Sequence, residues 1–212
     1  MNDVRESKGT VLIVDDDGPV QESLTMLLDA AGYATCCHDS GEDLLRNEPP
    51  EGPACLVLDL NMPGMSGIEI QRRLLESGWN IPIVFLTGHG DVPAAVEALQ
   101  NGAVDFIEKS RMEPADLLAS IEVCVSEHRR RMVEREASES EQRRIDRLTA
   151  REFQVARLAS AGKTNGVIGM ELSISERTVE IHRGRAMKKL GLRTAAELAR
   201  LEPILDHVAS GG

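Results

Sequence analysis

The chain carries two different patterns of hydrophobic residues. In the first half, short uninterrupted runs of aliphatic residues alternate with stretches in which an apolar residue recurs every three or four positions. The short runs are typical of strands buried on both faces, and the longer spacing is typical of amphipathic helices. Five strands alternating with helices predict an α/β fold, a doubly wound five-stranded parallel sheet. The predicted strands are residues 10–14, 34–38, 55–59, 81–87 and 104–108.

The last third of the chain has only the helical pattern. Thr149, followed three residues later by Glu152 and then by an apolar run, is a capping box that marks the start of a helix. Two helices joined by a tight turn, the second of them basic, predict a small all-α helix-turn-helix domain. The expected helices run from the capping box to Gly162, over 165–172 with Asn165 as its cap, from Ser175 to Gly191, and onward from Thr194.

Between these two parts lies a charged stretch, residues 121–147, that contains neither Pro nor Gly. Its apolar residues are too sparse for a coiled-coil stripe, and opposite charges recur at neighbouring-turn spacing. The stretch is either a flexible charged linker or a long solvated helix that sets the distance between two domains. The predicted division is a domain over 1–120, a charged helical linker over 121–147, and a second domain over 148–212.

Charge is distributed unevenly over these three segments. Residues 1–120 carry 7 Lys/Arg and 21 Asp/Glu, the linker carries 7 of each, and residues 148–212 carry 10 basic and 7 acidic residues. Only the last segment has the sign that favours nucleic acid. The overall net charge of −11 argues against a nonspecific DNA coat.

The apolar runs and the cysteines indicate the compartment. No run approaches the length of a membrane span, and the polar start, MNDVRESK, lacks the apolar region of an export signal. The four cysteines, of which Cys36 and Cys37 are adjacent, have neither zinc nor disulfide spacing. We therefore expect a cytoplasmic protein without a membrane partner, in which the cysteines serve as small hydrophobic residues.

Polar residues follow four of the five predicted strands. Asp15 and Asp16 end the first strand, Asp59 the third, Thr87 the fourth and Lys109 the fifth. If these strands are neighbours, their carboxyl ends bring three carboxylates together, which requires a cation among them, and such oxygen ligands suit Mg²⁺. An Asp beside Mg²⁺, a Lys and a hydroxyl can act as nucleophile toward a phosphoryl group. The simpler interpretation of Asp59 is a strand-end residue that caps a turn.

Residues 10–120 resemble the receiver domain of bacterial two-component response regulators. The matching stretches are VLIVDDD, LVLDLNMPGMSG, FLTGHGDVPAAVEA and GAVDFIEK, and the last two are similar to FixJ-type regulators. The resemblance implies a flavodoxin-like receiver fold in which Asp59 is the phosphoacceptor and Lys109 pairs with the acyl phosphate. It also implies Mg²⁺ ligands at Asp15, Asp16, Asp59 and the carbonyl of Asn61, a Thr87 that moves to the phosphate, and Phe106 as the coupled aromatic rotamer.

Several of these residues have structural alternatives. Asp17 more simply caps the following helix than binds metal, and Phe106 is also explained as a core residue. His89, two residues after Thr87, could influence hydrolysis of the phosphoryl group or could be a solvent-facing loop residue. Lys109 is either a phosphate partner or a solvated charge at a strand end.

One position departs from the receiver pattern. The family usually has Pro after the Lys, often with a cis bond, whereas here Lys109 is followed by Ser110. A cis bond before Ser110 would cost about 3–4 kcal/mol. We therefore expect Lys109 to be less firmly placed than in the family.

Residues 148–201 resemble the LuxR/NarL-type DNA-binding domain, through LTAREFQVARLASAGKTN, LSISERTVEIHRGRAMKKLG and RTAAEL. On the third helix, Val179, Ala186 and Leu190 are expected in the core. Helical spacing groups Arg177, Glu180, Ile181 and Gly184 on a face for the major groove. The predicted phosphate contacts are Thr178, His182, Arg185, Lys188 and Lys189, although the two lysines also suit a helix C-terminus.

The second helix of this domain also departs from its family. Gly166 and Gly169 stand where the family commonly has Lys and Ala. Each Gly costs a helix roughly 1 kcal/mol, so this helix is expected to be soft, with one phosphate contact missing.

Together these features predict a DNA-binding transcriptional response regulator. A sensor histidine kinase would transfer a phosphoryl group to Asp59 with Mg²⁺, and the face formed by 94–100 and 104–108 would form a homodimer on a double-stranded DNA operator. The chain would not be an enzyme, except toward its own phosphorylation and dephosphorylation at Asp59.

Three other functions fit less well. The absence of Pro after Lys109 motivates a phosphorylation-independent DNA-binding regulator with a degenerate receiver. An aspartyl-phosphate hydrolase of the haloacid-dehalogenase kind needs an Asp where this chain has Asn61. A dinucleotide-dependent enzyme is disfavoured because no G-x-G-x-x-G follows the first strand.

Overall fold

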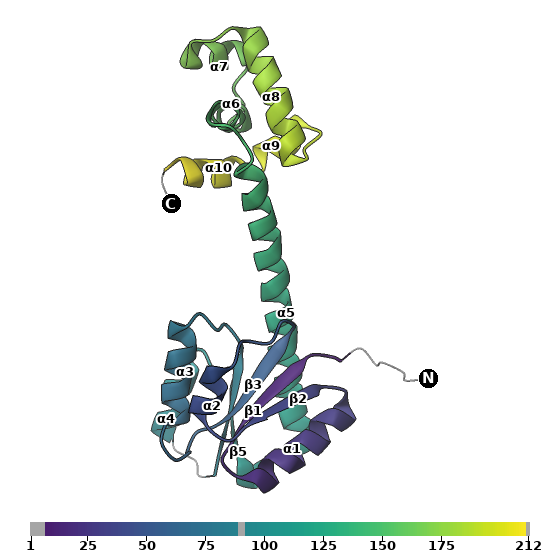
Figure 1. The fold of residues 1–212 in the computed structure, drawn as a ribbon, viewed down its shortest axis with the longest axis vertical. Helices are drawn as coiled ribbons and strands as arrows, with labels where there is room; N and C mark the ends of the chain where they lie inside the picture. Colours follow the sequence, from purple (N-terminus) through teal and green to yellow (C-terminus); the bar gives the residue numbers. More distant parts are fainter. Residues whose placement is uncertain (1–6, 89–91, 211–212) are drawn as a thin grey trace, which may run out of the picture. The chain divides into compact units, whose positions relative to one another are not determined.

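The computed structural model describes residues 7–88 and 92–210. The chain forms two compact units, Met1–Val133 and Glu134–Gly212. Figure 1 shows a sheet flanked by helices in the first unit and helices alone in the second. The predicted domain limits at residues 120 and 147 stay predictions, and each unit is described separately below.

The first unit is built on a parallel sheet with strand order β2-β1-β3-β4-β5. All of its neighbouring strands run parallel, because each strand is linked to the next by a helix that crosses over a face of the sheet. The strands are β1 (Thr10–Val14), β2 (Ala34–His38), β3 (Ala54–Asp59), β4 (Ile83–Thr87) and β5 (Asp105–Glu108). The prediction of five parallel strands is confirmed, and β4 and β5 begin two residues and one residue later than predicted.

Among the described residues, five helices belong wholly or partly to this unit and cover both faces of the sheet (Figure 1). Side chains that alternate along each strand point to opposite faces, so every central strand contributes to two cores. Leu56, Leu58 and Phe85 belong to one core, and Val57 and Leu86 belong to the other. The helices are α1 (Gly18–Ala31), α2 (Gly41–Arg46), α3 (Gly67–Glu76), α4 (Val92–Gln100) and α5 (Pro114–Ile145).

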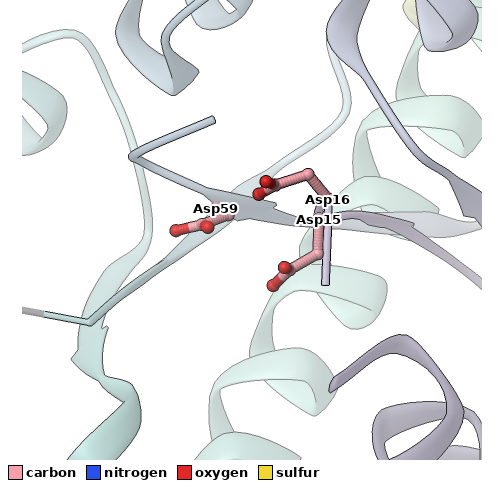
Figure 2. Close-up of side chains that lie close together, drawn as sticks. All are labelled: Asp15, Asp16 and Asp59. Atoms are coloured by element: carbon pink, nitrogen blue, oxygen red, sulfur yellow. The ribbon is translucent and has the colours of Figure 1, made fainter. Parts of the chain in front are cut away.

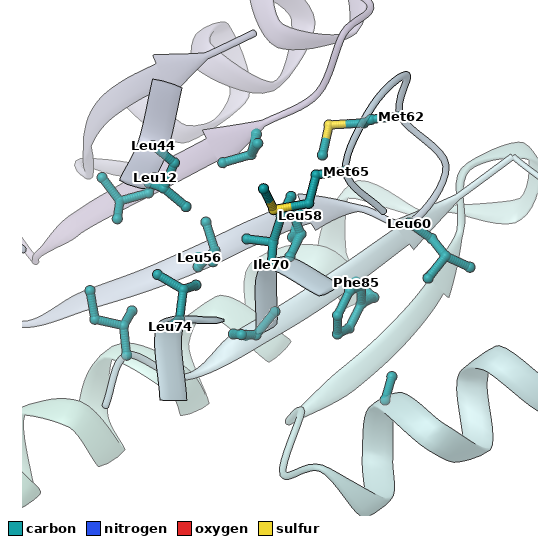
Figure 3. Packing of buried hydrophobic residues seen from close by; sticks show 14 of the residues in the cluster. Leu12, Leu44, Leu56, Leu58, Leu60, Met62, Met65, Ile70, Leu74 and Phe85 are labelled. Atoms are coloured by element: carbon teal, nitrogen blue, oxygen red, sulfur yellow. The ribbon is translucent and has the colours of Figure 1, made fainter. Parts of the chain in front are cut away.

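The first core, shown in Figure 3, lies between the sheet and α2, α3 and α4. Leu44 of α2 and Ile70 of α3 are fully buried in it, together with Phe85 of β4. The second core contains Leu24 and Leu28 of α1 and Leu117 and Ile121 of α5. The two apolar layers make the sheet a rigid support for the residues at its carboxyl edge.

The charged stretch is helical as far as Ile145, which favours the helical linker over the flexible one. It forms most of α5, which runs without interruption for 32 residues. Ile121, Cys124 and Val125 are buried against the first unit, and Ile145 is buried in the core of the second. Charged pairs one turn apart, such as Arg131 with Glu127 at 2.7 Å, support the exposed part of the helix.

The second unit contains the predicted helices, with one addition and one changed cap. The capping box of Thr149 and Glu152 is present, and Gly191 ends the third helix in the left-handed region at φ 73°. Thr164, and not Asn165, caps the second helix, because its side chain accepts the Val167 N–H. The helices are α6 (Ala150–Ser160), α7 (Asn165–Leu172), α8 (Glu176–Leu190), α9 (Ala195–Ala199) and α10 (Glu202–Ala209). Of the described helices, none combines the length and apolar character needed to cross a membrane.

The two glycines of α7 differ in their surroundings. A Cβ at Gly166 would meet nothing within 4 Å, whereas a Cβ at Gly169 would lie 2.8 Å from the Ile174 carbonyl oxygen. Gly169 therefore allows the backbone of the turn before α8 to approach α7 closely. Weakening of the helix by Gly166 stays a prediction, whereas the close approach at Gly169 gives that glycine a structural role.

We expect Gly166→Ala to raise the free energy of unfolding by about 0.5–1 kcal/mol, because it removes backbone entropy from the unfolded chain at an open helical position. Gly169→Ala should gain less than this or destabilise, since the turn must move to admit the methyl group. Chemical denaturation of both full-length variants checks the difference. An equal or larger gain for Gly169→Ala would contradict the role assigned to the close approach.

Candidate functional site

Three carboxylates meet at the carboxyl edge of the sheet (Figure 2). Asp15 and Asp16 directly follow β1, and Asp59 is the last residue of β3, the neighbouring strand. One oxygen atom of each lies within 4.8 Å of those of the others. Asp15 and Asp59 are buried and Asp16 is exposed, so a cation could approach from the side of Asp16.

Lys109 reaches the same edge from the end of β5. Its Nζ lies 2.6 Å from Asp15 Oδ2 and 3.1 Å from Asp59 Oδ2. Residues Lys109–Arg111 form a short 3-10 turn, and the peptide bonds among the described residues are trans. Two buried carboxylates thus contact its ammonium without help from a proline, and the expectation that Lys109 is less firmly placed than in the family stays a prediction.

Backbone amides hold the remaining carboxylate oxygens. The Asp17 N–H donates to Asp15 Oδ1 at 3.0 Å, and the Asn61 N–H donates to Asp59 Oδ1 at 3.3 Å. Asp17 itself caps α1, with its side chain accepting the Val20 N–H, as predicted. The two buried carboxylates are thus oriented by their own strand-to-helix loops.

The predicted switch residues lie next to this group. Thr87, at the end of β4, is fully buried, and Asn61 Nδ2 donates to its Oγ1 at 3.4 Å. Phe106 of β5 is half-buried against the first core, and its ring centroid lies 6.3 Å from that of Phe85. His89 lies outside the described residues.

The electrostatics of the site favour an additional cation. Burial raises the pKa of Asp59, as does the neighbouring Asp15 charge, although Lys109 and the Asn61 amide act in the opposite direction. Burial by itself would lower the pKa of Lys109, but its hydrogen bonds with Asp15 and Asp59 outweigh burial and raise it. A divalent ion would lower the cost of keeping Asp59 ionised and therefore nucleophilic.

Two supporting residues escaped the sequence analysis. A Cβ at Gly67, the first residue of α3, would lie 2.5 Å from the Asp59 carbonyl oxygen, so the loop after Asp59 can close only over a glycine. Gln21 of α1 donates from Nε2 to the Asp15 carbonyl at 2.6 Å and to the His38 carbonyl at 3.0 Å. The sequence could have identified Gln21, because it is a polar residue on the apolar face of a predicted helix.

The second unit presents the outer face of α8. Arg177, Glu180 and Gly184 are exposed, and Ile181 has 47% of its surface accessible. Val179, Ala186 and Leu190 are buried in the core, as predicted. An exposed apolar residue between charged ones on a basic helix is typical of a surface that reads base edges.

The predicted phosphate contacts are not all on this face. Arg185 and Lys188 are exposed, and Thr178 Oγ1 is within 2.7 Å of the Ser175 hydroxyl oxygen. Lys189 instead donates to buried Glu152 Oε2 at 2.6 Å and to the Arg147 carbonyl at 3.0 Å. This ion pair gives Lys189 a role within the fold of the domain, and its assignment as a phosphate contact stays a prediction. The Nδ1 atom of His182, the remaining residue of that set, is buried.

Family models cover both units. The model described as the response regulator receiver domain matches residues 11–122, and the model described as bacterial regulatory proteins of the luxR family matches residues 146–201. The first match contains Asp15, Asp16, Asp59 and Lys109, and the second contains α6 to α9.

Relatives of known name have the same two-part organisation along nearly their whole length. The transcriptional regulatory protein FixJ of Rhizobium meliloti is 43% identical over 91% of this chain and 94% of its own. Nodulation protein W of Bradyrhizobium diazoefficiens is 35% identical over 96% of this chain and 89% of its own. The solved structure of the response regulator StyR has a TM-score of 0.86 at 42% identity and covers 92% of this chain and 98% of its own.

The chain belongs to the response regulators, in the group that joins a receiver domain to a LuxR-family DNA-binding domain. Within that group it is similar to FixJ, and it is a transcription regulator driven by phosphorylation.

The Glu152–Lys189 pair makes the stability of the second unit depend on pH. The hydrogen bonds from Lys189 and from the Thr149 amide lower the pKa of Glu152 from 4.5 to about 2. Because the folded carboxyl binds its proton more weakly than the unfolded one, this contribution is complete above about pH 4.5 and is lost as the pH falls toward 2. We expect Glu152→Gln to destabilise the domain at pH 7 and to differ progressively less from the wild type in acid.

Thermal unfolding followed by circular dichroism from pH 7 to pH 3 measures this difference. Glu176→Gln, at an exposed position in the first turn of α8, is the matched control and should show little effect at either end of the range. A constant gap between the Glu152→Gln variant and the wild type across the range would show that the ion pair is not its origin.

Proposed function

We propose that Asp59 accepts a phosphoryl group from a sensor histidine kinase. One Asp59 oxygen forms a bond to phosphorus while the phosphorus–nitrogen bond of the phosphohistidine breaks, and the imidazole leaves with a proton. The convergence of Asp15, Asp59 and Lys109 at one buried edge carries this proposal. The same chemistry with a small phosphodonor would make the chain a catalyst of its own phosphorylation and dephosphorylation only.

The carboxylates fit a magnesium ion. Asp15, Asp16 and Asp59 are hard oxygen donors, and the buried charge of the first and third needs more positive charge than one ammonium provides. When bound, Mg²⁺ would neutralise charge on the phosphoryl oxygens during transfer. These three residues would hold it together with the Asn61 carbonyl.

The other residues of the site act on the acyl phosphate. The Lys109 ammonium contacts both Asp15 and Asp59. It would replace one of these two hydrogen bonds with one to a phosphate oxygen. Thr87 would exchange its contact with the Asn61 amide for the new phosphate. Movement of the Thr87 side chain would leave room at β4, which Phe106 on the adjacent strand would occupy.

We place the dimer surface on α4 and β5, over 94–100 and 104–108. Val96 and Leu99 of α4 have 49% and 48% of their surfaces exposed, which supports an apolar contact there. A dimer would present two copies of α8 to the two half-sites of a double-stranded DNA operator. A protein that acts on DNA in this way would work in the bacterial cytoplasm.

The alternative of a degenerate receiver has no structural support at Lys109. It was motivated by the missing proline, and the lysine nevertheless contacts both buried carboxylates. The hydrolase alternative is also disfavoured, because Asn61 provides an amide at the position where that mechanism requires a general acid.

Incubation of the full-length protein with Mg²⁺ and acetyl phosphate should add one phosphoryl group, and Asp59→Asn should abolish the addition. Lys109→Gln should slow it roughly 100-fold, since it removes a cationic donor from the site of charge development. Intact-mass spectrometry and phosphate-affinity electrophoresis measure both.

Asp29→Asn is the matched control, because Asp29 is an aspartate on α1 outside the carboxylate group. It should be phosphorylated at the wild-type rate. Undiminished phosphorylation of Asp59→Asn would exclude Asp59 as the acceptor.

The salt dependence of affinity for a duplex selected by binding should distinguish the predicted phosphate contacts from the predicted base contacts. Arg185→Ala should weaken all duplexes alike and reduce the slope of log K against log salt by about 1, as for one lost phosphate contact. Glu180→Ala should leave the slope unchanged and alter which duplexes are preferred. Arg200→Ala, at the end of α9, is the charge-matched control. A loss of slope as large for Arg200 as for Arg185 would contradict the assignment of the α8 face.

A further inference from the structure

The adjacent cysteines Cys36 and Cys37, which we expected to serve as small hydrophobic residues, are exposed. They lie in β2, which is at the edge of the sheet and pairs only with β1 among the described strands. Successive side chains of a strand point to opposite faces, so the two thiols have different neighbours.

Cys36 has a histidine as its neighbour. Its Sγ lies 3.6 Å from Nε2 of His38, two residues along the strand and therefore on the same face. On the other side of the ring, Nδ1 lies 2.7 Å from Oδ2 of Asp43 on α2. The His38 ring is buried, with 5% of the residue exposed, whereas the Asp43 side chain is 47% exposed.

The order of these three groups fixes the tautomer of the histidine. A carboxylate accepts hydrogen bonds and cannot donate them, so Asp43 selects the imidazole with its proton on Nδ1. The lone pair of Nε2 then points at the Cys36 thiol. A nucleophile, a base within reach and a carboxylate that orients the base form the arrangement that activates cysteine in thiol chemistry.

We propose that Cys36 is a reactive thiol, activated by His38 and Asp43, that exchanges with low-molecular-weight disulfides. The Cys36 proton passes to His38 Nε2, and the sulfur attacks one sulfur of the disulfide. A new sulfur–sulfur bond forms, the original one breaks, and the leaving thiolate takes the proton from His38. The products are a mixed disulfide at Cys36 and one free small thiol.

Cys37 lacks this arrangement and cannot resolve the product. Its Sγ lies 3.4 Å from the Thr25 hydroxyl of α1, which is not a base at neutral pH. Because Cys37 points to the opposite face, it does not reach the Cys36 sulfur for a second exchange. Cys55 and Cys124 are buried, and burial raises the pKa of Cys55 well above its ordinary value. The mixed disulfide at Cys36 therefore persists until an external thiol removes it.

Strand β2 is hydrogen-bonded to Asp15, which lies beside the proposed phosphoacceptor Asp59. The carbonyl of His38 accepts the Asp15 N–H at 3.2 Å and the Gln21 side-chain amide at 3.0 Å. The activated thiol lies two residues before this carbonyl, on the same strand.

The test compares two full-length variants, Cys37→Ser, which keeps Cys36, and Cys36→Ser, which keeps Cys37. Each is reacted under native conditions at pH 7 with 5,5′-dithiobis(2-nitrobenzoate) and, separately, with glutathione disulfide followed by mass spectrometry. An ordinary thiol is only a few per cent thiolate at this pH, so we expect Cys36 to react about tenfold faster than Cys37. In denaturant the two variants should react at equal rates.

Two further substitutions in the Cys37→Ser background identify the cause. His38→Gln should reduce the rate of Cys36 to within about twofold of that of Cys37, and Asp43→Asn should reduce it in part. Glu42→Gln, at the neighbouring exposed carboxylate of α2, is the matched control and should leave the rate unchanged. Since Asp43 is half-exposed, its variant tests the proposal even if the buried His38 variant does not fold.

Equal native rates for Cys36 and Cys37 would overturn the proposal. So would a fast Cys36 whose rate is unchanged by Asp43→Asn and by a folded His38→Gln variant, because exposure alone would then explain the reactivity.

Discussion

The first unit depends on a concentration of like charge at one edge of its sheet. Parallel strands end together, so β1 and β3 bring Asp15, Asp16 and Asp59 within a few ångströms in a mostly buried place. Lys109 offsets part of this charge by reaching past the end of β4 to contact two of the carboxylates. A site balanced in this way responds to any new charge, which is the physical basis of a phosphorylation switch.

The second unit also contains a buried carboxylate paired with a lysine, and there the pair holds two helices together. Glu152 is buried at the start of α6 and is held by Lys189 of α8 and by the Thr149 amide. The pair fastens the end of α8 to the core while Arg185 and Lys188 stay exposed on its outside. The two lysines at the end of one helix therefore differ in their surroundings, because Lys189 is paired within the domain and Lys188 is exposed.

The edge strand β2 joins two kinds of chemistry. Its last residue, His38, orients toward Cys36 through its side chain and binds the Asp15 amide through its carbonyl. Gln21 reinforces this junction from α1. The Cys36 thiol and the Asp15 carboxylate thus lie at one hydrogen-bonded strand pair, although the thiol is exposed and the carboxylate is buried.

The sequence by itself determined the strands and helices, because the spacing of apolar residues differs between the two. It also determined the capping box at Thr149, the cap at Asp17 and the polar residues at the strand ends, because these depend only on nearby residues in the chain. Only the tertiary structure decided which polar groups meet. Lys109 bridges Asp15 and Asp59, Lys189 turns inward to Glu152, and Gly67 and Gly169 admit close backbone approaches. Asp43 orients His38 toward Cys36 across two elements. These contacts join residues of different strands, helices and turns, so no local sequence pattern predicts them. They form only when the elements pack together.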